Sequence, residues 1–480
     1  MAWIGLAAAW AARADTFTGG TWAVRFNRPD QTTSFGSVGP EEFALRDAWL
    51  ARIDSLGSND WACLSTFTFS GNTASGGAAG PILAAISNAL ARGARVGFVV
   101  DKGVDTASNF WPGVSLKSLA GRPGNKLQLA QSPAGGGIMH HKMGVFWHRG
   151  EGKAWVLSGS WNMTGGASSQ QWNVLTEIQD NALGAACSNE LRELLSGRFQ
   201  SNSDKSHAHD GARFRLEGAT RDGWVRFAPY PDGRYGGTNA LTDVVAAIDA
   251  AEDEIFFALN KLTRDGVADA LIRACDRGVT VHGTIPKSDR AFVGQDSHEI
   301  CRKLLDARNY ATRNRVRLYD AYYDAARSRQ DNGSRDLVHA KYMAIDPRGE
   351  NPLAIHGSAN WTASGLVLTS SNDENVQFLP HRGIALAFAA QFAAMTDGMK
   401  PWCLLRGAGT PELAWLDYWL PDDGAYEAEW AEKIGGGEEW NRVATALPGV
   451  RGTNAAPVPV ERTGTRRFYR IRGAGMEAKR

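Results

Sequence analysis

The sequence predicts an α/β protein that contains two copies of one lobe and a small C-terminal appendage. The chain has 480 residues, which exceeds one ordinary domain and favours two or three. One order of helical and strand patterns occurs twice, and a short polar motif follows it each time. Hydrophobic content of 43% and charged content of 21% exclude a disordered chain, a coiled coil and an integral membrane bundle.

The first element is an apolar N-terminal stretch, residues 1–14. Ala12-Arg13-Ala14 before Asp15 has the small-x-small form of a signal-peptidase site, although a basic start is missing. We expect a cleaved signal peptide and a secreted or periplasmic protein, with a short amphipathic helix as the alternative. No other stretch approaches the roughly 20 apolar residues that span a bilayer.

The first copy, residues 25–200, follows the order helix, strand, helix, strand. Apolar spacing and turn residues place these elements at residues 39–56, 61–69, 81–92 and 95–101. Pro81 suits the first position of a helix, and Gly93 suits its end. The N-terminal lobe is therefore expected to hold a strand-helix-strand unit.

The second copy, residues 223–400, repeats this order after a polar join near residues 200–222. Its four elements are expected at residues 241–251, 254–259, 266–277 and 279–285. Arg92-Gly93-Ala94-Arg95-Val96 at the end of the first unit is matched by Arg277-Gly278-Val279-Thr280-Val281 in the second. Strands joined by helical crossovers predict parallel sheets in both lobes.

The last part of the chain, residues 401–480, has a different composition. Residues 411–440 hold nine acidic residues and one Lys, whereas residues 462–480 hold seven basic residues. We expect a small β module whose acidic and basic parts pair with each other, with short strands at residues 458–462 and 467–472.

A polar motif follows the repeat in each copy. It begins with a His-x-Lys step, which is His140 and Lys142 in the first copy and His339 and Lys341 in the second. A Gly-Ser-x-Asn turn comes next and contributes Ser160, Asn162, Ser358 and Asn360. Side chains two positions apart on a strand point to the same face, so each lobe presents an imidazole and an ammonium to one pocket.

Two such sets facing each other would form a site for a phosphodiester. One imidazole can attack phosphorus and the other can protonate the leaving oxygen, while the lysines, amides and hydroxyls stabilise the charge. This cationic clamp needs neither a metal nor a cofactor. The five cysteines lie far apart without a C-x-x-C pair, which indicates neither a zinc site nor a disulfide framework.

These motifs resemble the signature of the phospholipase D superfamily, H-x-K-x4-D followed by a Gly-Ser-x-Asn turn, over roughly residues 25–400. The second copy matches throughout, including Asp346, which we therefore count among the catalytic residues. It also carries Glu374 where the family has a carboxylate that orients the catalytic imidazole. The resemblance implies two α-β-α sandwich lobes related by a pseudo-twofold axis. It also implies one shared active site and a phosphohistidine intermediate.

The first copy departs from this pattern at two positions. Trp147 stands where the signature has Asp. If residues 172–174 align with residues 374–376, Trp172 replaces the orienting carboxylate and Glu177 is the remaining substitute. An imidazole without a carboxylate has a less stabilised charged form and a less fixed tautomer.

The roles of the two imidazoles follow from these points. Without its own carboxylate, His140 is expected to be the less well supported ring and His339 the better supported one. In two-copy members of the family the N-terminal histidine usually attacks. The resemblance therefore favours His140 as nucleophile and His339 as acid, and the reverse assignment stays open.

Three further residues near the motifs are candidates for substrate binding. Trp161 and Trp361 lie in the two turns, where they could line the rim, and packing in the core is the alternative. His356 precedes the second turn and could reach the pocket. His141 points away from His140 along a strand, so we expect it to pack or to support a tautomer.

The sequence predicts a phospholipase D-type phosphodiesterase that hydrolyses or transfers the head group of a glycerophospholipid, giving phosphatidate. We expect a monomer acting at a membrane or micelle surface, which the 17 tryptophans suit. A nuclease for DNA or RNA is the first alternative, although 52 basic against 51 acidic residues give a weak footprint for a polyanion. A phosphate-binding pseudoenzyme is the second. Cardiolipin synthase has a similar layout but normally carries transmembrane helices.

Overall fold

The computed structural model describes most of the two lobes and the strands of the appendage. The described residues are 16–27, 43–71, 77–169, 171–200, 205–286, 299–301, 303–304, 316–320 and 337–396, with strand segments between residues 405 and 473. The predicted signal peptide, residues 1–14, lies outside them. Within the described parts of the chain, each helix is too short or too polar to cross a membrane.

The N-terminal lobe contains an eight-stranded sheet. Its strands are β1 (Thr16–Gly19), β2 (Trp22–Phe26), β3 (Trp61–Thr66), β4 (Arg95–Val100), β5 (Leu127–Gln131), β6 (Met143–His148), β7 (Lys153–Gly159) and β9 (Val174–Gln179). They lie in the order β1-β2-β9-β7-β6-β3-β4-β5.

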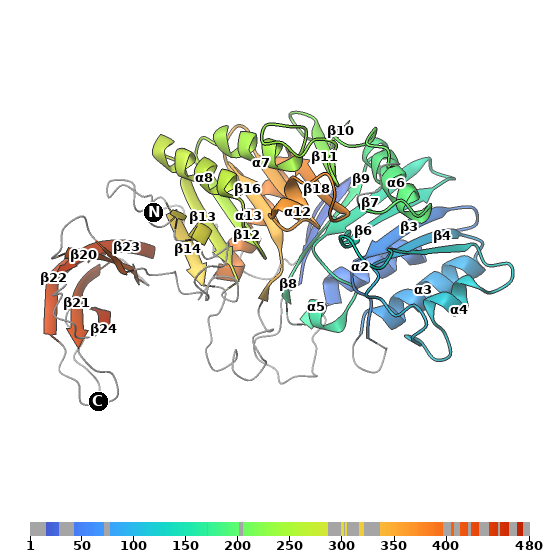
Figure 1. The fold of residues 1–480 in the computed structure, drawn as a ribbon, viewed down its shortest axis with the longest axis horizontal. Coiled ribbons are helices and arrows are strands. Elements are labelled where there is room, and N and C mark those ends of the chain that lie inside the picture. Colours follow the sequence, from blue (N-terminus) through green and yellow to red (C-terminus); the bar gives the residue numbers. More distant parts are fainter. Residues whose placement is uncertain are drawn as a thin grey trace.

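The C-terminal lobe contains a second eight-stranded sheet with an equivalent order. Its strands are β10 (Ala212–Phe214), β11 (Gly223–Ala228), β12 (Glu254–Leu259), β13 (Thr280–Ile285), β14 (Val316–Asp320), β16 (Lys341–Ile345), β17 (Leu353–Gly357) and β18 (Glu374–Leu379). The order β10-β11-β18-β17-β16-β12-β13-β14 matches the first sheet strand for strand, and Figure 1 shows the two lobes side by side. The predicted duplication of an α/β lobe is confirmed.

The sheets are mixed, and the expectation of parallel sheets is only partly right. β3, β4 and β5 run parallel, as do β12, β13 and β14. The strands that carry the polar motifs, β6 and β16, pair antiparallel with their neighbours. The reason is their short connections to β7 and β17, because a hairpin reverses chain direction whereas a helical crossover keeps it.

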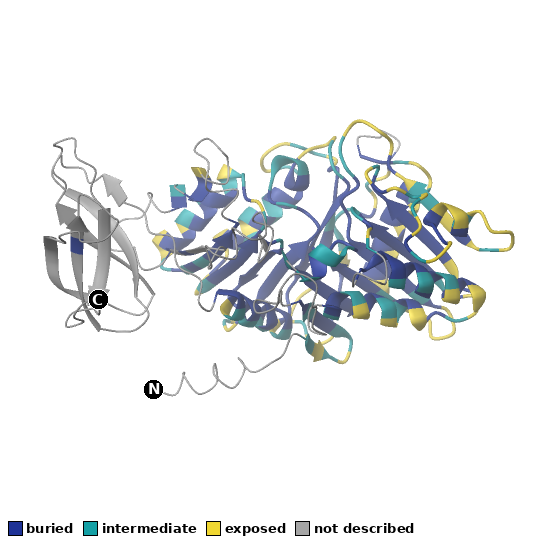
Figure 2. Cartoon of the chain, turned by 90° about the horizontal axis from the view of Figure 1, so that it is seen from below, coloured by how far each residue is buried: buried dark blue, intermediate teal, exposed yellow. Residues whose placement is uncertain are grey.

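Helices cover both faces of each sheet. On the outer faces lie α2 (Ala44–Asp54) and α3 (Ala79–Ala91) in one lobe and α7 (Ala240–Asp249) and α8 (Asp265–Arg277) in the other. Helix α8 ends at Gly278, whose φ of 106° is the left-handed conformation that glycine adopts without steric cost. Figure 2 shows that the strands are buried and that exposed residues gather on helices and loops.

The inner faces of the two lobes share one hydrophobic core. Helices α6 (Asn181–Leu195) and α13 (Arg382–Thr396) contribute to it together with strands of both sheets. Helix α6 also contacts β10 and β11, and α13 contacts β1 and β2. The lobes therefore pack reciprocally, as a pseudo-twofold relation requires.

Two short parallel pairings cross the lobe interface beside the polar motifs. Strand β15 (Leu337–Val338) pairs with β8 (Gln171–Trp172), and Met139 forms an isolated bridge with Asp373. Each pairing lies directly before a motif histidine. The backbone of each His-x-Lys step is thereby fixed to the other lobe.

The appendage forms two three-stranded sheets. Their strands are β19 (Leu405–Gly407), β20 (Leu413–Leu420), β21 (Gly424–Ala431), β22 (Asn441–Gly449), β23 (Gly452–Pro459) and β24 (Phe468–Gly473). The register of β21 against β24 places Glu427 opposite Arg472 and Glu429 opposite Arg470. This register agrees with the expectation that acidic and basic segments pair.

Candidate active site

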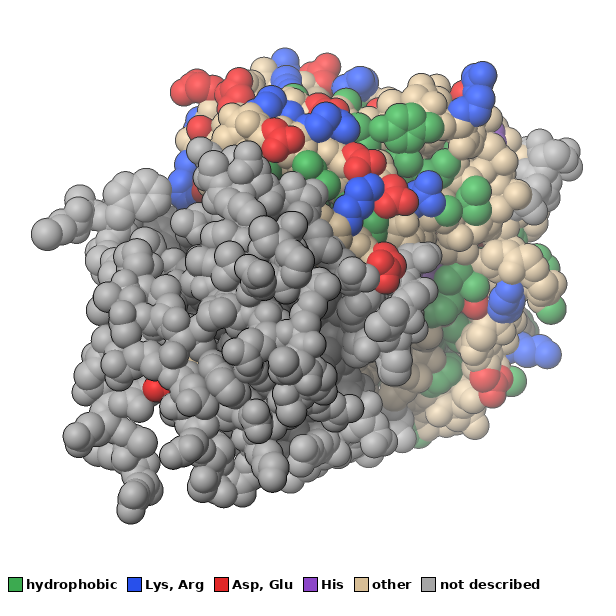
Figure 3. Space-filling view, turned by 60° about the vertical axis from the view of Figure 1, so that its left-hand side comes forward, with side chains coloured by type: hydrophobic (Ala, Val, Ile, Leu, Met, Phe, Trp, Pro, Cys, Tyr) green, Lys and Arg blue, Asp and Glu red, His purple; other side chains and the backbone are tan. Residues whose placement is uncertain are grey.

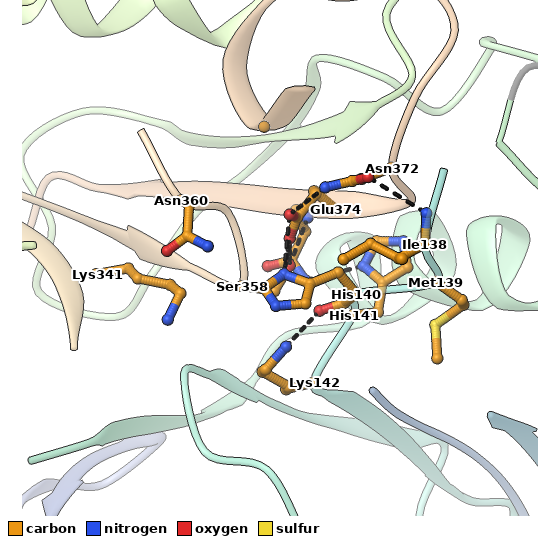
Figure 4. Close-up of polar contacts among 12 residues, drawn as sticks. Ile138, Met139, His140, His141, Lys142, Lys341, Ser358, Asn360, Asn372 and Glu374 are labelled. Carbon is orange, nitrogen blue, oxygen red and sulfur yellow. Dashed lines mark hydrogen bonds and ion pairs between the residues drawn. The ribbon is translucent and has the colours of Figure 1, made fainter. Parts of the chain in front are cut away.

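The two His-x-Lys steps meet at the lobe interface. Lys142 directly precedes β6 and Lys341 is the first residue of β16, and each histidine lies two residues earlier in the chain. Each lysine Nζ donates to the carbonyl oxygen of its own histidine at 2.8 Å. Figure 4 shows His140 and Lys142 on one side of the site and Lys341 on the other. The sequence-predicted clamp is therefore assembled from both lobes.

Glu374, the first residue of β18, holds the imidazole of His140. Both of its carboxylate oxygens lie 2.8 Å from Nδ1 of His140, and the two side chains are almost fully buried. Ser358 Oγ donates to Oε2 of Glu374 at 2.8 Å, and Asn372 Nδ2 donates to Oε1 at 3.3 Å. The carboxylate of the C-terminal lobe thus supports the histidine of the N-terminal lobe.

Asn173, which precedes β9, holds the imidazole of His339 in the same manner. Its Oδ1 atom lies 2.9 Å from Nδ1 of His339 and accepts a hydrogen bond from Ser160 Oγ at 2.8 Å. Its Nδ2 atom donates to the carbonyl of Ala167 at 2.9 Å. The amide is therefore held by hydrogen bonds with its oxygen toward the imidazole.

Backbone register corrects the alignment expected from the sequence. The backbone N–H of His140 donates to the carbonyl of Asp373, and that of His339 donates to the carbonyl of Trp172. Trp172 is thus equivalent to Asp373, and Asn173 to Glu374, one residue away from the expected match. The expectation that His140 lacks a carboxylate is wrong, because its carboxylate comes from the other lobe.

Glu177 does not substitute for an orienting carboxylate. Its side chain lies in ion pairs with Arg25, at 3.5 Å, and with Arg52. Arg52 also stacks over the ring of Trp155. Glu177 is buried in β9, and within the described part of the chain its hydrogen bonds go to these two arginines and not to a motif histidine.

Burial and like charges act on the basic groups of the site. Burial lowers the pKa of His140 well below its usual range, and Lys142 and Lys341 lower it further. The pKa of His339 is lowered by burial and by the same two lysines. Both rings are therefore neutral near pH 7 in the absence of a bound anion.

The pKa values of the two lysines and of Glu374 are also shifted by burial. Burial lowers the pKa of Lys142 to about 7 and that of Lys341 well below its usual range. Burial raises the pKa of Glu374 to about 7, opposed by the charge of Lys142. When an anion enters the site, the histidines and lysines are expected to become protonated, because a nearby opposite charge favours the charged form of each group.

The serines of the two turns act differently from the expectation. Ser160 and Ser358 donate to Asn173 and Glu374 and accept the backbone N–H groups of residues 174 and 375. Their hydroxyls therefore position the groups that hold the histidines and are not free donors for a phosphate.

The turn asparagines remain candidates for contact with substrate. Asn162 is 9% exposed, and its Oδ1 atom has no hydrogen-bond partner within the described residues. Asn360 accepts from Nδ2 of Asn260 at 3.3 Å, and Figure 4 shows it beside Lys341.

Asp346 completes the sequence signature but lies outside the site. Its carboxylate accepts the backbone N–H groups of residues 252, 253 and 254 at 2.8, 2.8 and 2.9 Å. It follows the end of β16 that is remote from Lys341, and it caps the start of β12. Its placement among catalytic residues is therefore corrected to a structural role.

The three predicted substrate-binding residues are buried in packing contacts. Trp161 and Trp361 are 2% and 1% exposed and belong to the outer cores of the two lobes. His356 is 1% exposed, contacts Thr176 Oγ1 at 3.0 Å through Nε2 and packs against the ring of Phe388. These residues do not line the rim, because the two tryptophans pack into the outer cores and His356 is buried within β17.

Comparison with known proteins identifies the family. The family described as "Cardiolipin synthase, PLD-like domain" matches residues 55–195 and 244–396, one region in each lobe. The chain belongs to this family of phospholipase D-like domains. Membership assigns phosphodiesterase or phosphotransferase chemistry to the site. No curated protein sequence matches the chain.

Solved structures match the chain at low sequence identity, and one of them, with a TM-score above 0.5, shares the fold. Phosphatidylserine synthase of Haemophilus influenzae Rd KW20 matches with a TM-score of 0.52 and 11% identity, over 79% of this chain and 87% of that one. Polyphosphate kinase of Porphyromonas gingivalis gives 0.46 and 12%, over 77% of this chain but only 46% of that one. Nuc of Salmonella typhimurium gives 0.28 and 20%, over 38% of this chain and 97% of that one.

A buried charge network lies behind the histidines of this phospholipase D-like site, and the sequence reasoning missed it. Glu190 of α6 contacts Nε2 of His141 at 3.0 Å and Nε2 of His209 at 2.8 Å, and pairs with Lys205. Lys205 also pairs with Asp373 at 3.1 Å. His141 thus packs in a buried network, which is one of the two roles expected for it, and the network holds Asp373, the residue before Glu374.

Proposed function

We propose that the chain is a phospholipase D-type enzyme that cleaves the head-group phosphodiester of a glycerophospholipid and passes the phosphatidyl group to water or to an alcohol. The observation that carries the proposal is the meeting of two His-x-Lys steps and one carboxylate across the lobe interface. Two imidazoles that come from opposite lobes and interact electrostatically at one site suit in-line displacement at phosphorus.

In the first step His140 attacks phosphorus. Its Nδ1–H is held by Glu374, so the lone pair of Nε2 is free for phosphorus and the charged ring that forms keeps a counter-ion. The P–N bond forms while the bond from phosphorus to the head-group oxygen breaks. His339 gives its Nε2 proton to that oxygen, and the head group leaves as an alcohol.

In the second step the phosphohistidine is resolved. His339, now neutral, takes the proton of a water or alcohol molecule, whose oxygen attacks phosphorus as the P–N bond to His140 breaks. Water gives phosphatidate, and an alcohol gives a new phospholipid. Lys142 and Lys341, which lie on the two sides of the site, stabilise the negative charge of the transition state.

A lipid suits the surface of the molecule better than a nucleic acid. Basic and acidic side chains are interspersed over the described part of the face in Figure 3, and the net charge of the chain is +1. Affinity for nucleic acids depends on concentrated basic surface. The names of the matching family and of the phosphatidylserine synthase refer to phospholipid synthesis, which supports an alcohol as acceptor.

The test measures lipid and nucleic acid turnover side by side. Vesicles of phosphatidylcholine, phosphatidylethanolamine or phosphatidylglycerol are assayed for head-group release with and without glycerol, and plasmid DNA for nicking in EDTA. Lipid turnover by the native protein, lost in His140→Ala and His339→Ala, supports the proposal. Nicking without lipid turnover would replace it with a nuclease, and inactivity on all substrates would favour a phosphate-binding pseudoenzyme.

A further inference from the structure

The negative charges of the active site are unevenly distributed. On the His140 side lie Glu374, in direct contact with the ring, and Asp101, which is 2% exposed and acts on the charges of His140 and Lys142. Asp101 accepts the backbone N–H of Met139 at 2.8 Å. Both carboxylates therefore act on the His140 half of the site, and Glu374 also acts on Lys341 of the other half.

The His339 side has an amide in place of a carboxylate. Asn173 is 1% exposed, and its backbone N–H donates to Oδ1 of Asn27 at 2.7 Å. Its Nδ2 is used by Ala167, so only Oδ1 faces the imidazole. An amide oxygen fixes the Nδ1–H tautomer as a carboxylate would, but it provides no charge to stabilise the imidazolium.

The other groups facing His339 oppose its protonation. Nζ of Lys341 lies 3.5 and 3.4 Å from the two ring nitrogens, and Lys142 and His140 act on the ring from the other lobe. Among the described residues no carboxylate contacts this ring, and Glu374 is committed to His140. A ring between basic groups gains a proton readily only when a negative charge arrives.

We propose that His339 takes up its proton together with the phosphate of the substrate, because the bound anion supplies the counter-charge that Asn173 does not. Identifying the anion as a phosphodiester rests on the proposed function. The free enzyme then keeps His339 neutral, and the acid for the leaving head group is loaded only in the complex. Asn173 is the positioning residue that establishes this dependence.

The test follows the ring of His339 by NMR in protein labelled with 13C-histidine, with His339→Gln for assignment. Sulfate serves as the probe, since it carries two charges and does not titrate near pH 7. In the native protein, saturating sulfate is expected to raise the pKa of His339 by about one unit or more. In Asn173→Asp the pKa of His339 is already raised in the free protein, so sulfate is expected to raise it by less.

Two further variants keep the test decisive. Asn181→Asp adds the same charge on the surface of α6, where the side chain contacts Gly152 and Ala154, and is expected to behave as the native protein. Glu374→Gln removes the counter-charge of His140, so sulfate should raise the pKa of this ring more in the variant than in the native protein. This variant provides a reading even if Asn173→Asp fails to fold.

The outcomes separate this inference from the proposed function. Sulfate that shifts the signals of the site but leaves the pKa of His339 unchanged would overturn the inference alone. An equal sulfate effect in the native protein and in Asn173→Asp would also overturn it. A native site that does not respond to sulfate at all would contradict phosphate binding, and with it both proposals.

Discussion

His140 and His339 have equivalent places in two equivalent lobes, yet the groups around the two rings differ. Each ring contacts a residue of the opposite lobe through Nδ1, at 2.8 Å from Glu374 for His140 and at 2.9 Å from Asn173 for His339. The serine behind each acceptor is the same. A duplicated half-site can thus keep its hydrogen-bonding framework while a neutral acceptor replaces a charged one. We expect the two imidazoles to have different catalytic roles as a result.

A second difference lies beside the first. The residue that follows β3 is Phe67, whose ring centroid is 4.8 Å from that of His140, and the residue that follows β12 is Asn260, which donates to Asn360. The His140 side therefore has an apolar wall and the His339 side a polar one. A polar wall suits the side from which a head-group alcohol leaves and an acceptor alcohol enters.

The largest effect is expected from Glu374→Gln. The variant removes the charge that stabilises the His140 imidazolium and allows the wrong tautomer, so kcat should fall by about 10²- to 10⁴-fold. Asn173→Asp should change kcat at its own pH optimum by less than about tenfold. Steady-state rates of head-group release measure both, and equal losses would remove the functional difference between the halves.

Asp346→Asn tests whether this signature residue has a structural role and no catalytic one. The substitution places an amide N–H group against backbone N–H groups at the start of β12, so we expect the free energy of unfolding to fall by about 1–3 kcal/mol. Urea unfolding measures this loss. The kcat of the folded variant should stay near the native value, and a catalytic loss without a stability loss would return Asp346 to the catalytic residues.

The pH dependence of kcat/KM tests how the amide of Asn173 affects the pKa of His339. His339 acts as an acid, so activity is lost as the pH rises through its pKa, which burial and the lysines lower. A carboxylate at position 173 raises that pKa, so Asn173→Asp should move the alkaline limb up by about one pH unit. An unmoved limb would mean that another group limits activity at high pH.

The smallest difference is expected between Ser160→Ala and Ser358→Ala. Each variant removes one hydrogen bond to the acceptor and one from a backbone N–H. Each should lower kcat by about tenfold or less, since a hydrogen bond contributes about 1 kcal/mol. A loss confined to Ser358→Ala would show that only the carboxylate needs this support.

Local patterns in the sequence were sufficient to predict the two lobes and the basic groups of the site. The predicted strand at residues 254–259 is β12, and the helix expected at residues 266–277 is α8 with one more residue at its start. The two His-x-Lys steps were found because strand alternation places both side chains on one face. Such features depend on neighbours in the chain, and these are visible in the sequence.

Contacts between the lobes could not be predicted in this way. The match of Asn173-Val174 to Asn375-Val376 suggested an alignment that the backbone register of β9 and β18 shows to be one residue off. The exchange of acceptors between lobes depends on the pairing of Met139 with Asp373 and of β15 with β8. A spacing of 13 residues from Ser160 to Asn173, against 16 from Ser358 to Glu374, hides this equivalence.

In the proposed mechanism the carboxylate-supported ring is the nucleophile and the amide-supported ring is the acid. The direct measurement is the trapping of the covalent intermediate from a phospholipid labelled at phosphorus with ³²P, in His339→Ala and in His140→Ala, with the labelled residue found by peptide mapping. This mechanism predicts label on His140 in His339→Ala and none on His339 in His140→Ala. Label on His339 in the native protein or in His140→Ala would contradict it.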